Sequence, residues 1–359
     1  MYGNIYKDKT VLVTGHTGFK GSWLTIWLQM MGARVVGYSL DPSSDNGNFG
    51  ACHLSGRMFA DVRGDVRDID HLAATVKKFR PEMVFHLAAQ ALVRPSYESP
   101  RETFETNIMG TINVLDIMRR DENLRRAVMI TSDKCYENVE QIWGYKETDR
   151  MGGQDPYSAS KGAAELTIAA YRHSYFDPMK FDQHGKAVAS VRAGNVIGGG
   201  DWSVNRLIPD CIRYIQADRP IEIRNPVATR PWEHVLEPLS GYLRVGQKLY
   251  EDPVKYATSF NFGPGLAANK TVLEVVRRLV EYYGRGTVID ASDPNALHEN
   301  TLLNLDVTKA YTMLDWEARW NLTEAVQKTV DWYKEAQKSK DMYDFCVKQI
   351  LEHGEHHVR

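Results

Sequence analysis

A hydroxyl, an acid and a base stand side by side in the sequence, at Ser132, Asp133 and Lys134. They follow the apolar run 127–130 (AVMI), which has the composition of a buried strand. In open α/β sheets, residues at the carboxyl end of such a strand border the crevice where ligands bind. The three side chains are therefore candidates for proton transfer to and from a bound molecule, and a surface ion pair in a loop is the structural alternative.

Tyr157 and Lys161 lie four residues apart in 155–175, a stretch with a helical pattern, so both side chains fall on one helix face. A lysine ammonium beside a phenol favours the phenolate, which predicts a tyrosine pKa lowered from its ordinary value of about 10. A tyrosine tuned in this way can take a proton from an alcohol at neutral pH. The spacing alone is common on helix surfaces, and the neighbouring motifs are what make it point to catalysis.

Three glycines, Gly15, Gly18 and Gly21, follow the strand pattern 10–15 and open a helical pattern. Glycines at this spacing permit a tight turn and a close approach of the backbone to a pyrophosphate, which the helix N-terminus then binds. In this strand–turn–helix context the motif, with Phe19 inside it, predicts a dinucleotide cofactor. A helix that is simply capped and packed closely on a strand is the structural alternative.

The adenosine half of such a cofactor predicts further contacts. An acid at the end of the second strand pattern binds the adenine ribose in dinucleotide folds. Asp41 follows the pattern 34–40 and favours NAD over NADP, and Ser39 is the alternative because Asp41 lies past the apparent strand end. Asp65 and Val66 follow a third strand and are placed to contact the adenine, unless they form only a surface turn.

The elements that must position these residues alternate between strands and helices in the first half of the chain. Near-continuous apolar strands separated by amphipathic helices predict a Rossmann-type doubly wound parallel sheet in the α/β class. The strand patterns lie at 10–15, 34–40, 83–89, 127–132, 187–198 and 259–263, and the helical patterns at 21–32, 68–80, 107–120, 271–284 and 321–340.

Beyond residue 195 the texture changes to a glycine run followed by amphipathic helices. We therefore predict an NAD-binding domain over 1–195, to which the later strand 259–263 returns. Residues 196–359 are predicted to form mainly a smaller substrate-binding region that is interlaced with the sheet.

The composition and net charge of the chain argue against two classes of binding partner. Of the 359 residues 43% are apolar and 25% charged, and the net charge of -2 gives no basic field that would imply nucleic acid or a membrane surface. The chain has no run of about 20 apolar residues and no signal-peptide pattern. Its four scattered cysteines and eleven histidines show no metal-ligand spacing, so we expect reduced thiols, no metal and a cytoplasmic location.

Together with these features, seven segments make the chain resemble the extended short-chain dehydrogenases/reductases that modify nucleotide sugars. The resemblance covers almost the whole chain. It implies NAD(P) in the N-terminal domain, a nucleoside-diphosphate sugar in the cleft, and a homo-oligomer, a dimer or a tetramer, that pairs through helices. The segments are TGHTGFKG, GDVRD, HLAAQ, NIMGTINVL, YSASK, RAGNVIGGG and LNLDVTKAYTMLDW.

The resemblance also implies roles for single residues. Leu87 and Ala88 would lie near the nicotinamide-side ribose, and Ser132 would hydrogen-bond the reacting sugar oxygen. Five residues would contact the substrate or lie near it: Gln90 and Asn107 near the active site, Asn195 and Arg230 at the diphosphate, and Arg206 as a weaker phosphate candidate. Asn195 could instead only cap a turn, and Arg206 could be a solvated helix charge.

The residues after Ser132 distinguish reactions within this family. Its 4,6-dehydratases carry an acid pair there, an aspartate acid and a glutamate base, which simple epimerases lack. Here Asp133 is followed by Lys134, as in the branch that acts on CDP-glucose, which GHTGFKGSWL, SDKCYEN and RPWEHVLEPL also resemble. The resemblance implies NAD+-dependent conversion of CDP-glucose to CDP-4-keto-6-deoxyglucose and water, a product class that feeds the deoxysugars of bacterial lipopolysaccharide and O-antigen.

The chemical role of Lys134 stays open in the sequence. It can remove the C5 proton only if it is neutral, which needs a pKa of about 7–8. It could instead share one proton with Asp133, or stay charged and stabilise an enolate while another group is the base. A nucleotide-sugar C4 epimerase and a non-catalytic NAD-binding sensor are the alternative functions, and the intact Ser132, Tyr157 and Lys161 argue against the sensor.

Overall fold

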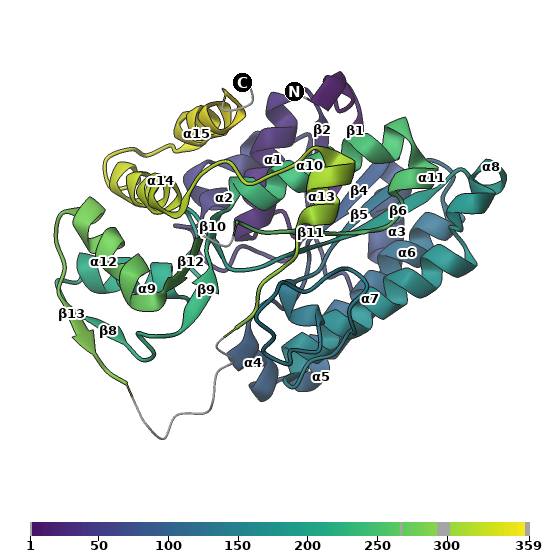
Figure 1. The fold of residues 1–359 in the computed structure, drawn as a ribbon. Helices are drawn as coiled ribbons and strands as arrows, with labels where there is room; N and C mark the ends of the chain where they lie inside the picture. The colour runs from purple at the N-terminus through teal and green to yellow at the C-terminus, as the bar shows by residue number, and fades with distance from the viewer. Residues whose placement is uncertain (1, 266–267, 293–301, 356–359) are drawn as a thin grey trace.

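A computed structural model describes residues 2–265, 268–292 and 302–355 of the chain (Figure 1). A seven-stranded sheet stands at its centre, and all its neighbouring strands are parallel. In spatial order the strands are β11 (Ser259–Phe262), β6 (Ala187–Ala193), β5 (Arg126–Ile130), β4 (Met83–His86), β1 (Thr10–Thr14), β2 (Arg34–Ser39) and β3 (Ala60–Arg63). The order reverses between β1 and β4, where a doubly wound sheet opens a crevice for ligands. The predicted Rossmann-type parallel sheet is thus confirmed.

Helices cover both faces of the sheet (Figure 1). One face carries α1 (Phe19–Met30) and α10 (Leu236–Glu251), and the other carries α3 (Ile69–Phe79), α6 (Gly110–Arg120) and α7 (Pro156–Ser174). Within β1, Val11 and Val13 pack on the first face and Leu12 on the second. Burial on both faces is why the strands read as near-continuous apolar runs.

Two predicted elements differ from the observed ones. The single strand expected over 187–198 is two strands, because β6 ends at Ala193 and β7 (Val196–Ile197) leaves the sheet to pair with β10 (Glu233–His234). The helix expected over 107–120 begins as a π-helix (Glu105–Met109) before it continues as α6. Both irregularities lie beside the candidate site described below, where such features are common.

A smaller region stands beside the sheet (Figure 1). Helix α12 (Val272–Tyr283) starts there with a capping box between Thr271 and Glu274 and ends at Gly284 in the left-handed conformation. Because α10 and β11, from the second half of the chain, lie in the sheet layers, the two regions are interlaced. The other elements of the smaller region are α9 (Leu207–Gln216) and the strand pairs β8 (Ile221–Ile223) with β13 (Val288–Asp290) and β9 (Thr229–Pro231) with β12 (Asn269–Thr271).

The C-terminal helices return to the first face of the sheet. Helix α15 (Tyr343–Glu355), which the sequence patterns do not predict, packs on α1. The remaining helices are α2 (Asn48–Ala51), α4 (Val93–Glu98), α5 (Pro100–Phe104), α8 (Phe181–His184), α11 (Pro253–Tyr256), α13 (Thr308–Leu314) and α14 (Leu322–Glu335), with 3-10 turns at Tyr2–Asn4, Leu54–Gly56, Asp133–Cys135 and Pro178–Lys180.

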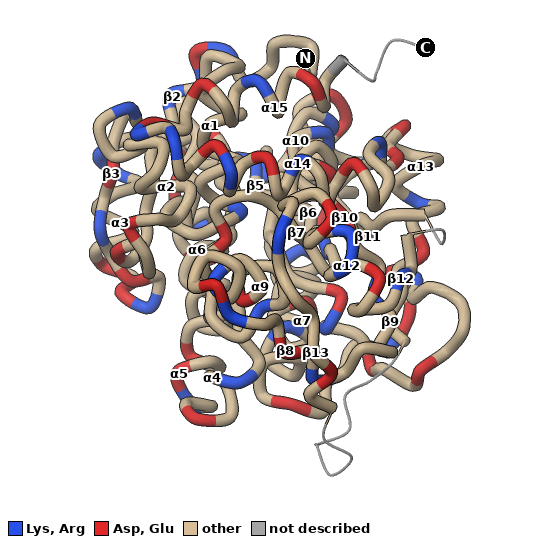
Figure 2. The backbone as a smooth tube through the Cα atoms, turned by 90° about the vertical axis from the view of Figure 1, so that its left-hand side faces the viewer, with Lys and Arg blue, Asp and Glu red and all other residues tan. Residues whose placement is uncertain are grey.

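Acidic and basic residues are interspersed along the chain, with no face of a single sign in this view (Figure 2). No helix in the described part of the chain is long and apolar enough to cross a membrane. The same described residues contain no cluster of three or more His, Cys, Asp or Glu side chains that could hold a metal ion.

Candidate active site

The glycine turn between β1 and α1 is built for close backbone approach. Gly15 has φ +73°, and a Cβ there would lie 2.7 Å from the Ala88 nitrogen, so the turn touches the chain that leaves β4. A Cβ on Gly21 would lie 2.1 Å from the Gly15 oxygen, which allows α1 to start directly against the turn. Only glycine satisfies both positions.

The outer side of this turn offers hydrogen-bond donors. Gly18 caps α1 without a side chain, and the first helical bond runs from the Ser22 N–H to the Gly18 oxygen. The N–H groups of the three residues between them therefore lack helical partners and carry the positive end of the helix dipole. Such a set of donors suits the pyrophosphate of a dinucleotide, which the sequence predicts here.

The residues predicted to contact the adenosine lie around this turn and differ in how far they are exposed to solvent. The Ser39 hydroxyl is 2.8 Å from the Thr17 hydroxyl inside the turn, whereas the Asp41 carboxylate is 88% exposed and pairs with Arg63 at 3.4 Å. Of the two candidates for the ribose contact, Ser39 therefore lies closer to the glycine turn than Asp41. At the next strand end, Asp65 pairs with Arg67 at 2.6 Å and Val66 is buried, with its backbone oxygen accepting from Asn113.

Leu87 and Ala88 border the same turn from the end of β4. The Leu87 N–H donates to the Thr14 backbone oxygen and the Ala88 N–H to the Thr14 hydroxyl, both at 3.2 Å. The carboxyl ends of β1 and β4 are thus joined at the point where the strand order reverses. Leu87 and Ala88 therefore border the crevice at this edge of the sheet, and their contact with the cofactor stays a prediction.

Strand β5 ends in the predicted group of polar residues. Ser132 and Asp133 are nearly buried, and the Ser132 hydroxyl donates to the Asp133 carboxylate at 2.8 Å. The Lys134 backbone N–H donates to the Ser132 hydroxyl at 3.3 Å, so Ser132 caps the 3-10 turn Asp133–Cys135. The Lys134 ammonium, which is half-buried, makes no hydrogen bond or ion pair within the described part of the chain.

Helix α7 brings Tyr157 and Lys161 to this strand end. Pro156 occupies the first turn, and the N-terminal cap is Asp155, which accepts from the Ser158 N–H at 3.0 Å. Tyr157 and Lys161 are both buried, and α7 packs against the 3-10 turn Asp133–Cys135, where the Ser132 hydroxyl lowers the pKa of Tyr157. The structure therefore joins the predicted tyrosine to the predicted strand end.

Burial changes the acid–base properties of this pair. Burial raises the pKa of Tyr157 to about 12, against the lowering effect of the Ser132 hydroxyl and with a further rise from Asp133. The predicted lowering by Lys161 is wrong for the protein alone, because the loss of phenolate hydration dominates. Burial, helped by Lys20, also lowers the pKa of Lys161 to about 8.

A buried ion pair joins α7 to the strands next to the end of β5. Glu165, one turn after Lys161 on α7, pairs with Arg192 of β6 at 2.8 Å, and both side chains are almost fully buried. Glu165 also accepts from the Thr131 and Ser190 hydroxyls. Helix α7 and strands β5 and β6 are thereby held in one register beneath Ser132.

Gln90 and Asn107 lie nearby, but their polar groups are used inside the protein. The Asn107 amide donates to the Gln90 oxygen at 3.0 Å and to Ser160 at 2.8 Å, and its oxygen accepts from the Gln90 N–H. The Gln90 amide binds Leu92 and Thr103. We therefore interpret Asn107 as a positioning residue that joins the π-helix to α7. Its predicted location near the active site is retained, but not a direct contact with the substrate.

The predicted diphosphate residues come from the smaller region and its junction. Arg206 precedes α9 and pairs with Asp201 at 3.4 Å, and its charge acts on Tyr157. Arg230 lies on β9, and one of its N–H groups donates to the Thr229 oxygen at 2.8 Å. Asn195 is half-buried between β6 and β7, where its backbone oxygen accepts a hydrogen bond from the Glu233 backbone N–H.

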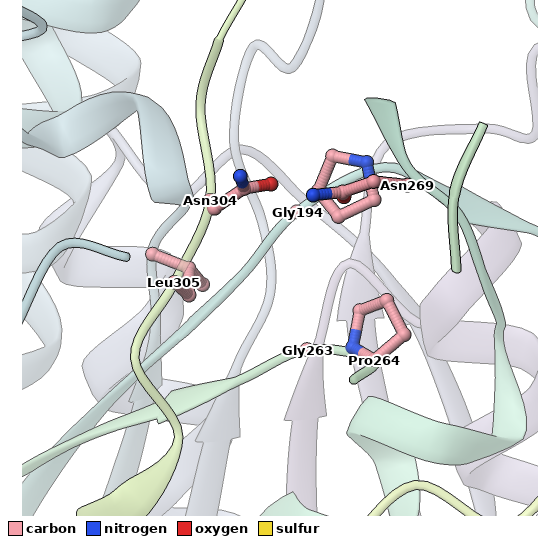
Figure 3. Close-up of a pocket in the computed structure, with 7 residues that line it drawn as sticks. Gly194, Gly263, Pro264, Asn269, Asn304 and Leu305 are labelled. Atoms are coloured by element: carbon pink, nitrogen blue, oxygen red, sulfur yellow. The ribbon is translucent and has the colours of Figure 1, made fainter. Parts of the chain in front are cut away.

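A small pocket lies beside Gly194, where the chain passes from β6 to β7 (Figure 3). A Cβ on Gly194 would lie 3.2 Å from the Asp133 carboxylate and 3.7 Å from Pro231, so the pocket borders the predicted acid. Figure 3 shows the Asn269 and Asn304 side chains in it, and the Asn269 oxygen is buried without a hydrogen-bond partner among the described residues. The lining residues are Gly194, Pro231, Gly263, Pro264, Asn269, Asn304 and Leu305.

The sequence patterns missed three residues near Asp133, namely Lys20, Tyr242 and Glu233. The Lys20 ammonium donates to the Tyr242 hydroxyl at 3.4 Å, and burial lowers the pKa of Lys20 to about 8. Glu233 is 1% exposed, both its carboxylate oxygens lack hydrogen-bond partners among the described residues, and burial raises its pKa well above the usual range. The sequence did offer a signal for two of them. A charged residue stands among apolar neighbours at Lys20, next to the glycine turn, and at Glu233 in RPWEHV.

Comparisons with known proteins show the family of the chain. The family model described as GDP-mannose 4,6 dehydratase matches residues 12–329. The chain is 48% identical over 348 residues to a protein of Salmonella typhimurium named CDP-glucose 4,6-dehydratase, with 97% of this chain and 96% of the relative covered.

Solved structures agree with the fold. A dTDP-glucose 4,6-dehydratase from Bacillus anthracis in complex with NAD matches with a TM-score of 0.75 at 20% identity, covering 91% of this chain and 97% of the other. A UDP-glucose 4-epimerase from Thermotoga maritima matches with a TM-score of 0.76 at 23% identity, covering 92% and 100%. The chain therefore belongs to the GDP-mannose 4,6 dehydratase family, within the extended short-chain dehydrogenases/reductases.

Proposed function

We propose that the protein is an NAD+-dependent hydro-lyase that converts CDP-glucose to CDP-4-keto-6-deoxyglucose and water. The observation that carries the proposal is the 48% identity, across almost the whole chain, to the Salmonella typhimurium protein of that name. The meeting of Ser132, Asp133 and Tyr157 in one buried site supports it, because oxidation and elimination both need proton transfers at that point.

The glycine turn would hold the cofactor. Bound NAD+ supplies a hydride acceptor for C4 of the sugar and afterwards a hydride donor for C6. The backbone N–H groups at the start of α1 bind its pyrophosphate, and Ser39 or Asp41 binds the adenine ribose. The complete set of cofactor residues in this proposal is Gly15, Gly18, Phe19, Gly21, Asp41 or Ser39, Asp65, Val66, Leu87, Ala88, Tyr157 and Lys161.

Each catalytic side chain has one task. The Tyr157 phenolate takes the proton of the C4 hydroxyl while Ser132 holds that oxygen, and Lys161 stabilises the phenolate. The keto group at C4 makes the C5 proton acidic, Lys134 removes it, and Asp133 protonates the departing C6 hydroxyl.

The substrate lies between the two regions of the chain in this proposal. Residues 1–195 with β11 bind NAD+, and residues 196–359 bind mainly the nucleotide sugar. Arg230 and Arg206 clamp the diphosphate with guanidinium groups, whose planar donors suit it, and Asn195 lies beside them. Gln90 lies at the sugar end.

We also infer a homo-oligomer, a dimer or a tetramer, that pairs through the outer faces of α6 and α7, because their inner apolar faces are already buried against the sheet and Leu166 of α7 is 61% exposed. A cytoplasmic location and a supply of deoxysugars for bacterial surface polysaccharide complete the proposal. Sedimentation of the purified protein measures the oligomeric state, and a monomer would contradict that part.

The decisive experiment incubates the protein and NAD+ with the glucose forms of CDP, UDP, dTDP and GDP in parallel. We expect CDP-glucose to lose the mass of one water and to give a product that absorbs strongly in alkali. A product of unchanged mass would identify an epimerase, which needs no acid beside Ser132. No change with any of the four sugars would overturn the proposal.

A further inference from the structure

We propose that a second cavity, beside the C-terminal half of α7, binds a small amino acid or hydroxy acid through the guanidinium group of Arg172. The cavity has a volume of about 360 Å³, which is in the size range of small-molecule sites in proteins. Neither Asp133 nor Tyr157 lines it, so it is separate from the candidate active site. The inference goes beyond the proposed dehydratase function and does not depend on it.

Helix α7, the loop that precedes it and the edge of the sheet line this space, which we call the α7 cavity. The loop contributes residues from 147–151, and the sheet edge contributes Arg192 of β6 and the segment 257–259 that leads into β11. The wall includes the ion pair of Glu165 with Arg192, whose side chains are only 2% and 4% exposed. Because that pair holds α7 to β6, the packing of the domain fixes the shape of the cavity.

Arg172 is the residue that indicates a ligand. It lines the cavity and is only 8% exposed, yet its side chain makes no hydrogen bond or ion pair with any residue that the structure describes. Burial lowers the pKa of Arg172 to about 10, and the charge of Glu165 only partly opposes this effect, so the guanidinium stays charged at neutral pH. A buried guanidinium has five N–H donors and needs acceptors for them, and the cavity has room for a molecule that supplies these acceptors.

The acids that line the α7 cavity do not pair with Arg172. The Glu165 carboxylate is held by Arg192 and by two hydroxyl groups. Glu147 and Asp149 each accept one backbone N–H at 2.8 Å, and their second carboxylate oxygens make no further hydrogen bond among the described residues. The cavity therefore offers one guanidinium without an acid and two carboxylate oxygens without a donor.

The charges around the cavity favour a carboxylate as the anionic group of the ligand. A guanidinium fork binds a carboxylate through two parallel hydrogen bonds. Lys309 adds positive charge, because its ammonium donates to the Thr258 hydroxyl of the cavity wall at 2.9 Å. Glu147 and Asp149 line the same cavity and repel a dianion such as phosphate, so a ligand group with a single negative charge fits best.

The other lining residues indicate the rest of the ligand. The second carboxylate oxygens of Glu147 and Asp149 are acceptors for an ammonium or hydroxyl group next to the ligand's carboxylate. Met151, Ala169 and Pro178 add apolar surface for a short carbon chain. A carboxylate, a donor group and a short carbon chain together are the chemistry of an amino acid or a hydroxy acid.

Saturation-transfer nuclear magnetic resonance tests the site in the intact chain, with the standard amino acids, lactate, glycerate, acetate and phosphate as probes. We expect at least one amino acid or hydroxy acid to bind, and acetate and phosphate to bind at least about tenfold more weakly. Arg172→Met keeps much of the side-chain length without the guanidinium and should abolish this binding. Arg101→Met is the matched control, because the Arg101 side chain is 90% exposed on α5 and its loss should leave binding unchanged.

Asp149→Asn distinguishes the two ligand classes and leaves Arg172 in place. It keeps an acceptor for the Lys146 backbone N–H but removes the negative charge. Amino acids, which carry an ammonium group, should then bind at least about tenfold more weakly, whereas hydroxy acids should bind nearly as before. Equal weakening of both classes would contradict the assignment of Asp149 to the ammonium group.

Three outcomes would overturn the proposal: no binding by any amino acid or hydroxy acid, equal binding by Arg172→Met and the wild type, or phosphate bound as tightly as the acids. A changed sedimentation of Arg172→Met, with no acid bound by the wild type, would show instead that a second copy of the chain fills the cavity. Circular dichroism checks that each variant is folded. Since every readout is binding and none is turnover of CDP-glucose, failure of the proposed dehydratase function would not affect the result.

Discussion

At the scale of single residues, the site is governed by loss of hydration. Tyr157, Lys161 and Lys20 carry pKa values moved toward their neutral forms, and burial is the largest cause for each. The protein alone therefore holds Tyr157 as a neutral phenol at neutral pH. The negative charge of Asp133 adds to the effect of burial on the Tyr157 pKa, so the phenolate would form more readily if Asp133 were protonated.

Tyr157→Phe tests the first proton transfer. The variant retains the ring and its packing but has no oxygen to accept the C4 hydroxyl proton, so oxidation should not begin. We expect no NADH absorbance after CDP-glucose is added, whereas Tyr171→Phe on the same helix should behave as the wild type. A normal burst of NADH in Tyr157→Phe would refute the role.

Lys134→Ala tests the second proton transfer. Oxidation at C4 does not use the lysine, so NADH should form on addition of CDP-glucose and then persist, with water loss at least about a hundredfold slower. Product mass and NADH absorbance are measured together. If turnover is normal, the base is another group. Lys20→Met then becomes the variant to measure, because Lys20 is a half-buried amine near Asp133 with a pKa of about 8.

At the scale of elements, the site depends on how chain segments end. Strand β5 stops before a 3-10 turn, α7 starts at a proline with an aspartate cap, and β6 breaks at Gly194 and Asn195. Each irregularity frees polar groups at the carboxyl edge of the sheet. The regular parts of the same elements are buried on both sides and only fix the position of these ends.

Gly21→Ala tests the cofactor turn. The new Cβ would clash with the Gly15 oxygen, so the turn must open and its N–H groups must move away from the pyrophosphate site. We expect calorimetric titration to give an NAD+ affinity at least about tenfold weaker, or about 1.4 kcal/mol. Gly56→Ala is the control, since a Cβ there meets nothing within 4 Å, and equal affinities for the two variants would contradict the expectation.

At the scale of the whole molecule, one buried glutamate connects α10, the segment before α14 and the last helix, α15. Glu237 of α10 accepts from the backbone N–H groups of Arg319 and Trp320, and it lies 3.1 Å from the His353 ring of α15. Burial alone would raise the pKa of Glu237, but His353 and the two N–H donors outweigh burial and lower it. A carboxyl with a lowered pKa stabilises the folded state above its unfolded pKa, and the stabilisation is lost as pH falls through the folded value.

Glu237→Gln tests this connection. Loss of the buried charge should lower the free energy of unfolding by about 3 kcal/mol at neutral pH and make its decline in acid shallower. Glu352→Gln is the control, because its 2.6 Å ion pair with Lys328 joins α14 and α15 at the surface and is worth less than about 1 kcal/mol. Urea unfolding at several pH values measures both, and equal effects of the two variants would contradict the buried role of Glu237.

Much of this molecule is determined by local sequence. The alternation of apolar strands and amphipathic helices, the three spaced glycines and the Tyr157–Lys161 spacing predict the sheet class, the turn and the helix face, because each depends on residues that are neighbours in the chain. The family and the fold class were predictable for the same reason, and both are confirmed.

Only the tertiary structure decided the contacts between distant segments. The packing of α7 on the end of β5, the use of Asn107 inside the protein, the buried Glu233 beside Lys20 and the packing of α15 on α1 all join residues far apart in sequence. The raised pKa of Tyr157 belongs with them, because hydration is lost only when the whole chain closes over the phenol. Sequence spacing carries no information about that burial, and so it gave the pKa shift the wrong sign.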